Sequence, residues 1–343
     1  MKKKQKIRLG KCLFCGIALL CASCTEDAGL LQDNPSALQL LSVTLDGTAG
    51  TAATRTLRTS VDAVGVYVTK PDHTAYASAT AYLYRLSGTT WSTDTPPEIT
   101  PSAGEAKVYA YYPSGLAVTN NSGGAHTVPV SVLSADDFLA TNQTDYLLTG
   151  TYDKAAASGS KLKVSSLDAS STNRALNITL VHALSKVSLR VLKSETATEK
   201  LTLKKVEILS PTNRIQTGSS GVMDLSTGVL SGLSSTSQLT LSNAAGIVLN
   251  TNSSAPNVTC LVAPMAGEEY LLSFRLTVDV LPAGAATPTE LVFETGVVST
   301  PQQWQTSKHY VYKVTVDKMG GGFSGVKIDD WQNDASQNTS IGI

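Results

Sequence analysis

The chain has 343 residues, of which 42% are apolar and only 16% are charged, with 27 basic and 27 acidic side chains. This length suits two domains of ordinary size, and the apolar fraction excludes a chain that is disordered throughout. The first 11 residues hold six of the basic side chains, so that without residues 1–23 the counts are 21 basic and 27 acidic, a net of −6. A mildly acidic chain without a basic cluster is poorly suited to binding phosphate backbones, so we expect no nucleic-acid partner.

The N-terminus has the three regions of a secretory signal peptide. Residues 2–11 are basic, residues 12–22 are apolar, and the small residues Ala22 and Ser23 precede Cys24. The apolar run is about half as long as the roughly 20 residues that cross a bilayer as a helix. A leader that ends on a cysteine resembles that of bacterial lipoproteins, which implies a signal peptide at residues 1–23, a lipid such as palmitate on Cys24 and a tether at residues 24–36. Simple secretion, with cleavage nearby, is the alternative.

From residue 41 onward the sequence alternates in the manner of β-strands. Leu41, Val43 and Leu45 alternate with hydroxyl side chains, and Asp46-Gly47 then indicates a turn. Further apolar or alternating stretches cover residues 64–68, 79–86, 107–113, 175–182, 187–191, 201–208, 258–262, 271–280, 291–293 and 310–316. Residues 134–140 could form one helical turn with Ser134 as its N-cap. Because no helices alternate with the strands, we expect an all-β chain of antiparallel sheets.

Small polar residues predict where these strands are interrupted. The stretch at residues 153–173 indicates a linker or a long loop, which divides the chain into β-sandwich domains at residues 37–160 and 161–343. A second stretch rich in Ser, Thr and Gly, at residues 231–242, predicts a surface loop. Gly320-Gly321-Gly322 opens no helix, so it predicts a hairpin loop rather than a phosphate-binding site.

The sequence offers few candidates for catalytic or metal-binding residues. None of the four histidines, His73, His126, His182 and His309, has a Cys, His or acidic residue at metal-ligand spacing. The sequence contains no Gly-x-Ser-x-Gly, His-Glu-x-x-His or Walker motif. Cys260 lies in an apolar stretch, which predicts a buried free thiol. We therefore expect no cofactor, no metal site and no enzymatic activity.

Four segments together resemble the fimbrillin (Mfa-like) family of Bacteroidetes. In chain order they are Ala53-Thr54-Arg55-Thr56 shortly before Val64-Gly65-Val66-Tyr67, then residues 107–113, then Val181-His182-Ala183-Leu184-Ser185-Lys186-Val187, and last residues 304–312 with Ile328-Asp329-Asp330-Trp331. Asp145-Tyr-Leu-Leu148 fits the same pattern. Glu26 and Asp27, behind Cys24, resemble the surface-export signal of Bacteroidetes lipoproteins. The ordered set spans residues 41–331, nearly the whole exported chain.

This resemblance implies two transthyretin-like β-sandwich domains in tandem. It also implies a lipoprotein precursor that is held in the outer membrane through Cys24 and then becomes part of a type V fimbrium at the cell surface. In that scheme a protease cuts after an arginine, here Arg55 or alternatively Arg58, and the strand with Leu41, Val43 and Leu45 leaves. Its loss exposes an apolar groove and unpaired backbone groups, which are a template for a strand of another pilus subunit.

The donor of that strand is expected in the C-terminal tail, where Ile341 and Ile343 alternate with polar residues, or else in residues 326–331. Leu41, Val43 and Leu45 are expected to be buried before cleavage, with roughly 1.5–3 kcal/mol for full burial of each. Two alternatives stay open. One is a lipid-anchored protein that binds a glycan or host ligand and never polymerises, for which the 12 tyrosines offer stacking surfaces. The other is a β-sandwich hydrolase, although the sequence offers no catalytic pair.

Overall fold

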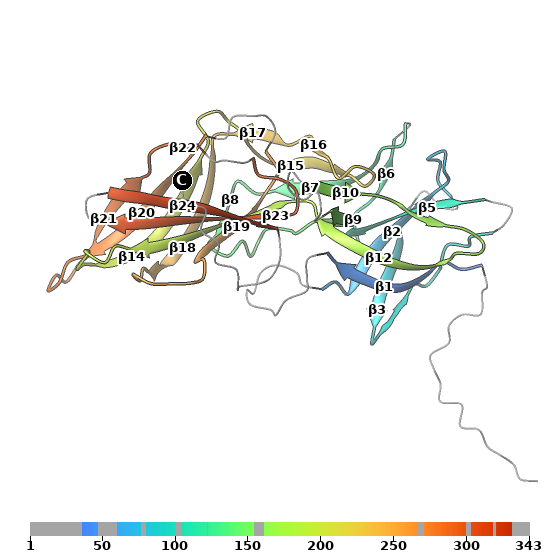
Figure 1. Ribbon diagram of the computed structural model, residues 1–343, viewed down its shortest axis with the longest axis horizontal. Helices are drawn as coiled ribbons and strands as arrows, with labels where there is room; N and C mark the ends of the chain where they lie inside the picture. Colours follow the sequence, from blue (N-terminus) through green and yellow to red (C-terminus); the bar gives the residue numbers. More distant parts are fainter. Residues whose placement is uncertain are drawn as a thin grey trace, which may run out of the picture. The chain divides into compact units, whose positions relative to one another are not determined.

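The chain folds into strands, turns and loops. The computed structural model describes residues 36–46, 60–76, 80–100, 104–121, 123–153, 161–265, 271–299, 303–317 and 320–330, and these residues contain no helix (Figure 1). The predicted all-β class is therefore confirmed. Residues Ser36–Ile343 form one compact unit, separate from Met1–Pro35.

The first sheet has nine strands and carries the first strand of the chain at its edge. Its order is β1-β12-β9-β5-β2-β3-β4, with β10 beside β9 and β11 beside β5. The strands are β1 (Gln39–Leu45), β2 (Ala63–Thr69), β3 (Tyr82–Ser87), β4 (Thr90–Ser92), β5 (Ala106–Tyr112), β9 (Leu147–Asp153), β10 (Lys161–Val164), β11 (Leu167–Ala169) and β12 (Ala175–His182).

This sheet is apolar on both faces, and the alternation of its central strands explains why. In β2, Val64, Val66 and Val68 belong to one core, and Tyr67 between them belongs to another. Because neighbouring side chains of a strand point to opposite faces, one strand supplies both cores. The first core contains residues of β1, and the second also contains residues of β7 and β15 from another sheet.

That other sheet has five strands in the order β16-β15-β7-β6, with β17 beside β15. Its strands are β6 (Thr119–Asn120), β7 (His126–Val132), β15 (Ile215–Asp224), β16 (Leu230–Ser231) and β17 (Ser234–Thr236).

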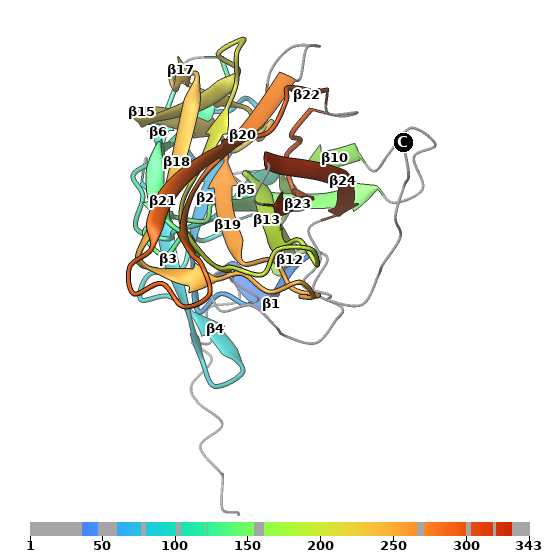
Figure 2. The same cartoon turned by 90° about the vertical axis from the view of Figure 1, so that its left-hand side faces the viewer.

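The remaining two sheets share one core. The four-stranded sheet has the order β19-β13-β23-β24, and the six-stranded sheet has the order β21-β20-β14-β18-β8, with β22 beside β20 (Figures 1 and 2). Leu189 of the first and Leu203 of the second lie in the same buried cluster. The strands are β8 (Ala135–Asp137), β13 (Ser185–Lys193), β14 (Lys200–Leu209), β18 (Gln238–Val248), β19 (Val258–Val262), β20 (Leu271–Leu281), β21 (Thr289–Glu294), β22 (Val298–Ser299), β23 (Lys308–Asp317) and β24 (Gly320–Asp330).

The expectation of purely antiparallel sheets is wrong at three places in the described chain. β1 pairs in parallel with β12, β13 with β23, and β8 with β18. In each case the partners are far apart in the sequence. Long connections permit parallel pairing, whereas a tight hairpin permits only antiparallel pairing.

The expectation of a helical turn at residues 134–140 is also wrong, because Ala135–Asp137 is strand β8. The Asp137 carboxylate accepts hydrogen bonds from the backbone N–H groups of Leu139, at 2.8 Å, and Thr141, at 3.1 Å, and from the Thr141 hydroxyl. An aspartate that binds the N–H two residues onward closes a turn of its own and competes with helix formation.

Three expected loops contain strands instead. The stretch at 153–173 includes β10 and β11, which pair with β9 and β5 of the nine-stranded sheet. The stretch at 231–242 includes β17 and the start of β18, and the three glycines at 320–322 open β24. Small polar residues at the first two places suit strands whose outer face meets water. Since β11 and β12 join the first sheet, strands on both sides of residue 160 belong to it; the division into tandem domains stays a prediction.

Candidate functional site

β1 is an edge strand that is held by one ladder. Within the described chain its sheet partner is β12, in a parallel register that runs from Gln39 opposite Ala175 to Leu45 opposite Leu180 (Figures 1 and 2). Just before the strand, the Leu38 N–H donates to the Pro97 carbonyl at 2.9 Å. A strand with one ladder can leave its sheet without separating two neighbours from each other.

A β-bulge decides which side chains of β1 face the core. Leu40 lies opposite Leu176 and Ser42 opposite Asn177, so Leu41 has no counterpart. The extra residue shifts the alternation by one position. As a result Leu41 is 56% exposed and its expected burial is wrong, while Leu45 is 5% exposed.

The inner side of β1 is continuous with the core of the nine-stranded sheet. Leu38, Leu40 and Leu45 are buried there, and Val43 is half-buried against the same cluster. Leu176, Ile178 and Leu180 of β12 belong to this cluster too. Full burial of a leucine is worth roughly 1.5–3 kcal/mol, so removal of β1 would expose an apolar groove that favours refilling.

Polar contacts complete the attachment of β1. The buried Tyr84 hydroxyl donates to the Leu38 carbonyl at 2.8 Å, and burial raises the pKa of this tyrosine. On the outer side the Ser42 hydroxyl donates to Asn177 Oδ1 at 2.7 Å, and the Thr44 hydroxyl donates to the Ile178 carbonyl at 3.3 Å. The strand therefore has an apolar inner face, while its outer face carries Ser42 and Thr44 beside the exposed Leu41.

Most of the other predicted site residues lie outside the described residues. These are the lipidation candidate Cys24, the cleavage candidates Arg55 and Arg58, and the donor candidates Ile341 and Ile343. The alternative donor segment is described up to Asp330. It forms the end of β24, where Ile328 lies opposite Tyr310 and Asp330 opposite Lys308 of β23.

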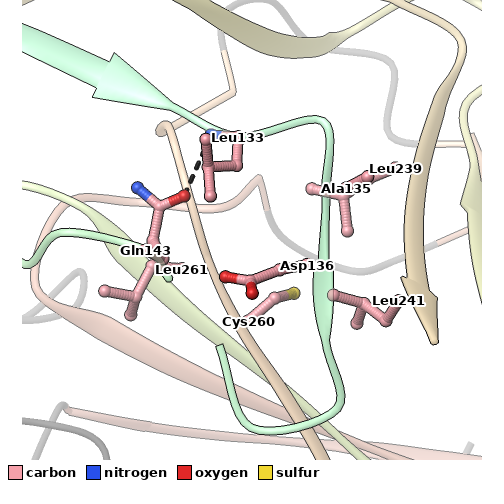
Figure 3. A pocket seen from close by; sticks show the side chains of 8 residues that line it. All are labelled: Leu133, Ala135, Asp136, Gln143, Leu239, Leu241, Cys260 and Leu261. Carbon is pink, nitrogen blue, oxygen red and sulfur yellow. Dashed lines mark hydrogen bonds between the residues drawn. The ribbon is translucent and has the colours of Figure 1, made fainter. Parts of the chain in front are cut away.

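A small pocket beside Cys260 offers no substrate site. Leu133, Asp136, Gln143 and Leu241 are among its lining residues, and the space holds about one water molecule (Figure 3). Burial, with Asp136 nearby, raises the pKa of the Cys260 thiol. The predicted buried free thiol is confirmed, and a thiol held protonated in an apolar setting is unreactive.

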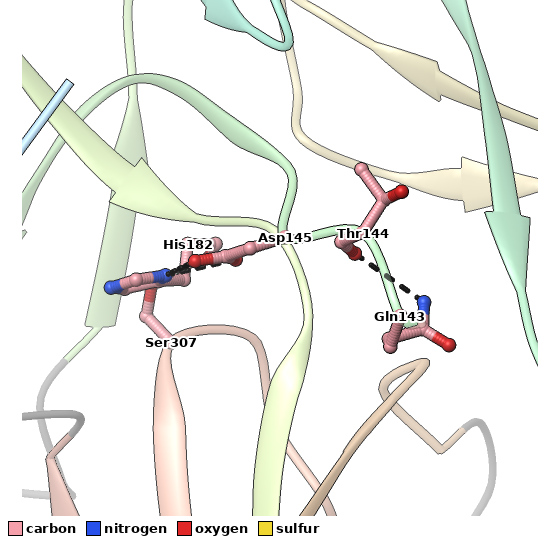
Figure 4. A network of polar contacts seen from close by, with 5 residues as sticks. All are labelled: Gln143, Thr144, Asp145, His182 and Ser307. Atoms are coloured by element: carbon pink, nitrogen blue, oxygen red, sulfur yellow. Dashed lines mark hydrogen bonds and ion pairs between the residues drawn. The ribbon is translucent and has the colours of Figure 1, made fainter. Parts of the chain in front are cut away.

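A buried polar network joins three of the segments that carry the family resemblance. His182 Nδ1 lies 3.0 Å and 3.1 Å from the two carboxylate oxygens of Asp145, and both side chains are buried (Figure 4). The Ser307 hydroxyl donates to the backbone carbonyl of His182 at 2.6 Å. Because this hydroxyl binds the main chain and not the imidazole ring, the three residues do not form a Ser-His-Asp relay.

Lys186, near the same network, is also buried. It lies in β13, opposite His309 of β23. Burial lowers the pKa of Lys186 to about 8, and the charge of Asp145 opposes that shift. In the sequence these residues belong to separate motifs. In the fold, the contacts of Asp145, His182 and Ser307 join the residues before β9, the end of β12 and the residues before β23.

The described residues contain little other chemistry. They hold no group of three or more His, Cys, Asp and Glu side chains that could bind a metal ion. Among them there is also no helix with the length and hydropathy of a membrane span.

A comparison with known protein families finds a match over most of the chain. The model of the family described as Fimbrillin-like matches residues 51–331, well over half of the chain. No curated protein matches the sequence.

Solved structures show the same fold at low sequence identity. A fimbrial protein from Bacteroides vulgatus is 10% identical, with a TM-score of 0.57, over 86% of this chain and 99% of its own. A candidate cell adhesion protein from Bacteroides uniformis is 18% identical, with a TM-score of 0.50, over 87% of this chain and 99% of its own.

Proposed function

Because the chain belongs to the Fimbrillin-like family, we propose that it is a structural and adhesive subunit of a fimbrium on the bacterial surface, assembled by exchange of β-strands between subunits. The observation that carries this proposal is the arrangement of β1, an edge strand with one ladder and a buried apolar face. It is the part of the described chain best suited to be replaced by a strand of the same kind.

Replacement of β1 leads naturally to a polymer. Without it, the outer N–H and C=O groups of β12 lose their partners and the apolar groove opens. A strand from another subunit restores both, since the ladder supplies affinity and alternate side chains supply register. The groove lies beside β12 and the proposed donor follows β24 in the sequence, so the contact is heterologous and can extend into a filament.

A single cut would release both the strand and the anchor. In the sequence, Arg55 and Arg58 follow β1, which ends at Leu45, and precede β2, which begins at Ala63. Cleavage after either arginine separates β1 from the rest of the chain and also removes the proposed lipid on Cys24. The precursor thus stays at the outer membrane, with its groove closed, until it is processed.

The C-terminal tail is the better candidate for the donor. Residues 326–330 already pair with β23, so their donation first requires that ladder to break. Ile341 and Ile343 follow this strand in the sequence and are proposed as the groove-filling side chains. The partners of the protein are then further copies or other pilus subunits.

The tyrosines disfavour the alternative of a protein that binds sugars on an aromatic platform. Every tyrosine whose side chain is described is buried or half-buried. Tyr67, Tyr84, Tyr111, Tyr310 and Tyr312 are among the largest side chains of the core. Their role is packing, in agreement with the low exposure of aromatic residues that fill cores.

The proposal is tested by controlled cleavage. The purified precursor is treated with an arginine-specific protease, and its size is followed by light scattering, with the Arg55→Ala, Arg58→Ala and double variants as controls. We expect polymers from the wild type and none from the double variant. A cleaved product that loses β1 and stays monomeric would contradict strand exchange.

A further inference from the structure

The turn after β2 and strand β7 bring two histidines together. The ring centroids of His73 and His126 are 5.8 Å apart. His73 is exposed, in a turn where its backbone has a φ of 67°, whereas His126 is fully buried at the start of β7. Gly124 makes room for this approach, because a Cβ there would lie 2.9 Å from the His73 ring.

Asn120 determines which nitrogen of His126 carries the proton. Its Nδ2 donates to the His73 carbonyl at 3.4 Å, so its Oδ1 is the atom that lies 3.1 Å from His126 Nδ1. A carbonyl oxygen can only accept, and Nδ1 must therefore be the donor. In the neutral ring the lone pair is then on Nε2.

That lone pair is buried and has no partner. His126 Nε2 makes no hydrogen bond, and neither does the buried hydroxyl of Tyr67, whose ring centroid is 5.2 Å from that of His126. Burial and the nearby His73 lower the pKa of His126, which favours the neutral ring, while the charge of Asp224 opposes that shift. An unpaired buried acceptor is costly, and it is also the form in which imidazole binds a metal ion.

We propose that His126 Nε2 and the ring of His73 form a two-imidazole site for a divalent metal ion of the Zn²⁺, Ni²⁺ and Cu²⁺ class. Two imidazoles that share a tetrahedral zinc ion have their ring centroids about 5 Å apart, which is close to the observed separation. Asn120 holds the other nitrogen of His126, as the outer partners of metal-bound histidines do. Solvent oxygens complete the coordination on the exposed side of His73.

A metal ion here would fasten two sheets together. His73 follows β2 of the nine-stranded sheet, and His126 begins β7 of the five-stranded sheet. An ion that binds only the folded arrangement stabilises it in proportion to its concentration and affinity. This site departs from the sequence-based expectation that the chain binds no metal, because that expectation considered only ligands that are close in the sequence.

Titration calorimetry with ZnCl₂ tests the site on the full chain, purified without a histidine tag at neutral pH. We expect one ion per chain for the wild type and at least tenfold weaker binding for His73→Gln. His309→Gln is the matched control, since the Nε2 of His309 already pairs with the Ser188 hydroxyl at 2.9 Å. This control should bind zinc as the wild type does.

Thermal unfolding provides the second readout. Zinc should raise the melting temperature of the wild type and of His309→Gln, and should leave that of His73→Gln unchanged. Absence of zinc binding by the wild type, or equal binding by His73→Gln, would overturn the proposal. The test does not depend on the buried His126, whose substitution could unfold the protein, because the exposed His73 decides it.

Discussion

β1 and β23 each pair in parallel with a strand that is distant in the sequence, but they are fixed in the fold to different degrees. β23 lies between β13 and β24 and has a ladder on each side, whereas β1 has its sheet partner, β12, on one side. The side chains of β23 alternate strictly between buried and half-buried, while a bulge interrupts the alternation of β1. The register and the number of hydrogen-bonded ladders, rather than apolar content, therefore distinguish a replaceable strand from one that stays in its sheet.

The largest expected effect comes from a covalent link that keeps β1 in its sheet. Ser42 and Asn177 lie opposite each other in the ladder and are in contact, so the double variant Ser42→Cys, Asn177→Cys should form a disulfide between β1 and β12. After cleavage at the arginines, this variant should stay monomeric when oxidised and polymerise when reduced, as measured by light scattering.

The single variant Ser42→Cys serves as the control and should polymerise under both conditions. Polymerisation of the oxidised double variant, with its disulfide verified by mass spectrometry, would show that β1 is not the strand that is exchanged.

The bulge predicts opposite outcomes for two neighbouring leucines. Leu40→Ala should lower the free energy of unfolding of the precursor by roughly 2–5 kcal/mol, because it leaves a cavity in the core. Leu41→Ala should change it by less than about 0.5 kcal/mol, because Leu41 is mostly exposed. Urea unfolding of both variants checks the pair, and similar losses would mean that the bulge is misplaced.

Near β23, stability should depend on pH through Lys186. Burial lowers the pKa of Lys186 from its ordinary value of 10.5 to about 8 in the folded chain. Between these two pH values the unfolded chain therefore binds more protons than the folded chain. Stability should therefore rise with pH across this window, by about 3 kcal/mol for this group, and the destabilisation should be fully present below pH 8.

Lys186→Met should remove that rise, as measured by denaturant unfolding at several pH values between 8 and 10.5. Lys200→Met, at an exposed lysine, is the matched control and should keep the rise. Identical pH profiles for the two variants would show that the burial of Lys186 does not cause the rise in stability with pH.

The smallest effect concerns the hydroxyl group of Tyr312 in β23. The Trp304 indole N–H donates to the Tyr312 hydroxyl at 2.9 Å, and both residues are buried. Tyr312→Phe leaves this donor without its acceptor and should cost about 1–3 kcal/mol of unfolding free energy in a thermal or urea melt. Trp304→Phe in the same background should then add no loss from the hydrogen bond, since the bond is already absent.

The positions of the strands were largely predictable from the sequence. β2, β5, β12 and β20 follow their alternating or apolar stretches closely, because period-two patterning reports burial directly. The short strands β16 and β17 were not predictable, since two or three residues such as Leu-Ser or Ser-Ser-Thr carry no alternation and only pairing with β15 makes them strands.

The position of strand β1 was predictable from the sequence, but which of its side chains are buried was not. The alternation of residues 41–45 located β1, yet the buried set is Leu38, Leu40 and Leu45, because a bulge depends on the partner strand. Asp145, His182 and Lys186 were visible as family motifs. The pairing of His182 with Asp145, and the charge of Asp145 near Lys186, were not visible, since they join segments that are distant in the chain.

The sequence alone determined the all-β class and its family resemblance, because hydrophobic alternation and short motifs are local properties of the chain. The tertiary structure alone decided which face of β1 is buried, which strands pair in parallel and which histidines meet. Each of these depends on contacts between segments far apart in the sequence, whose geometry no local pattern encodes.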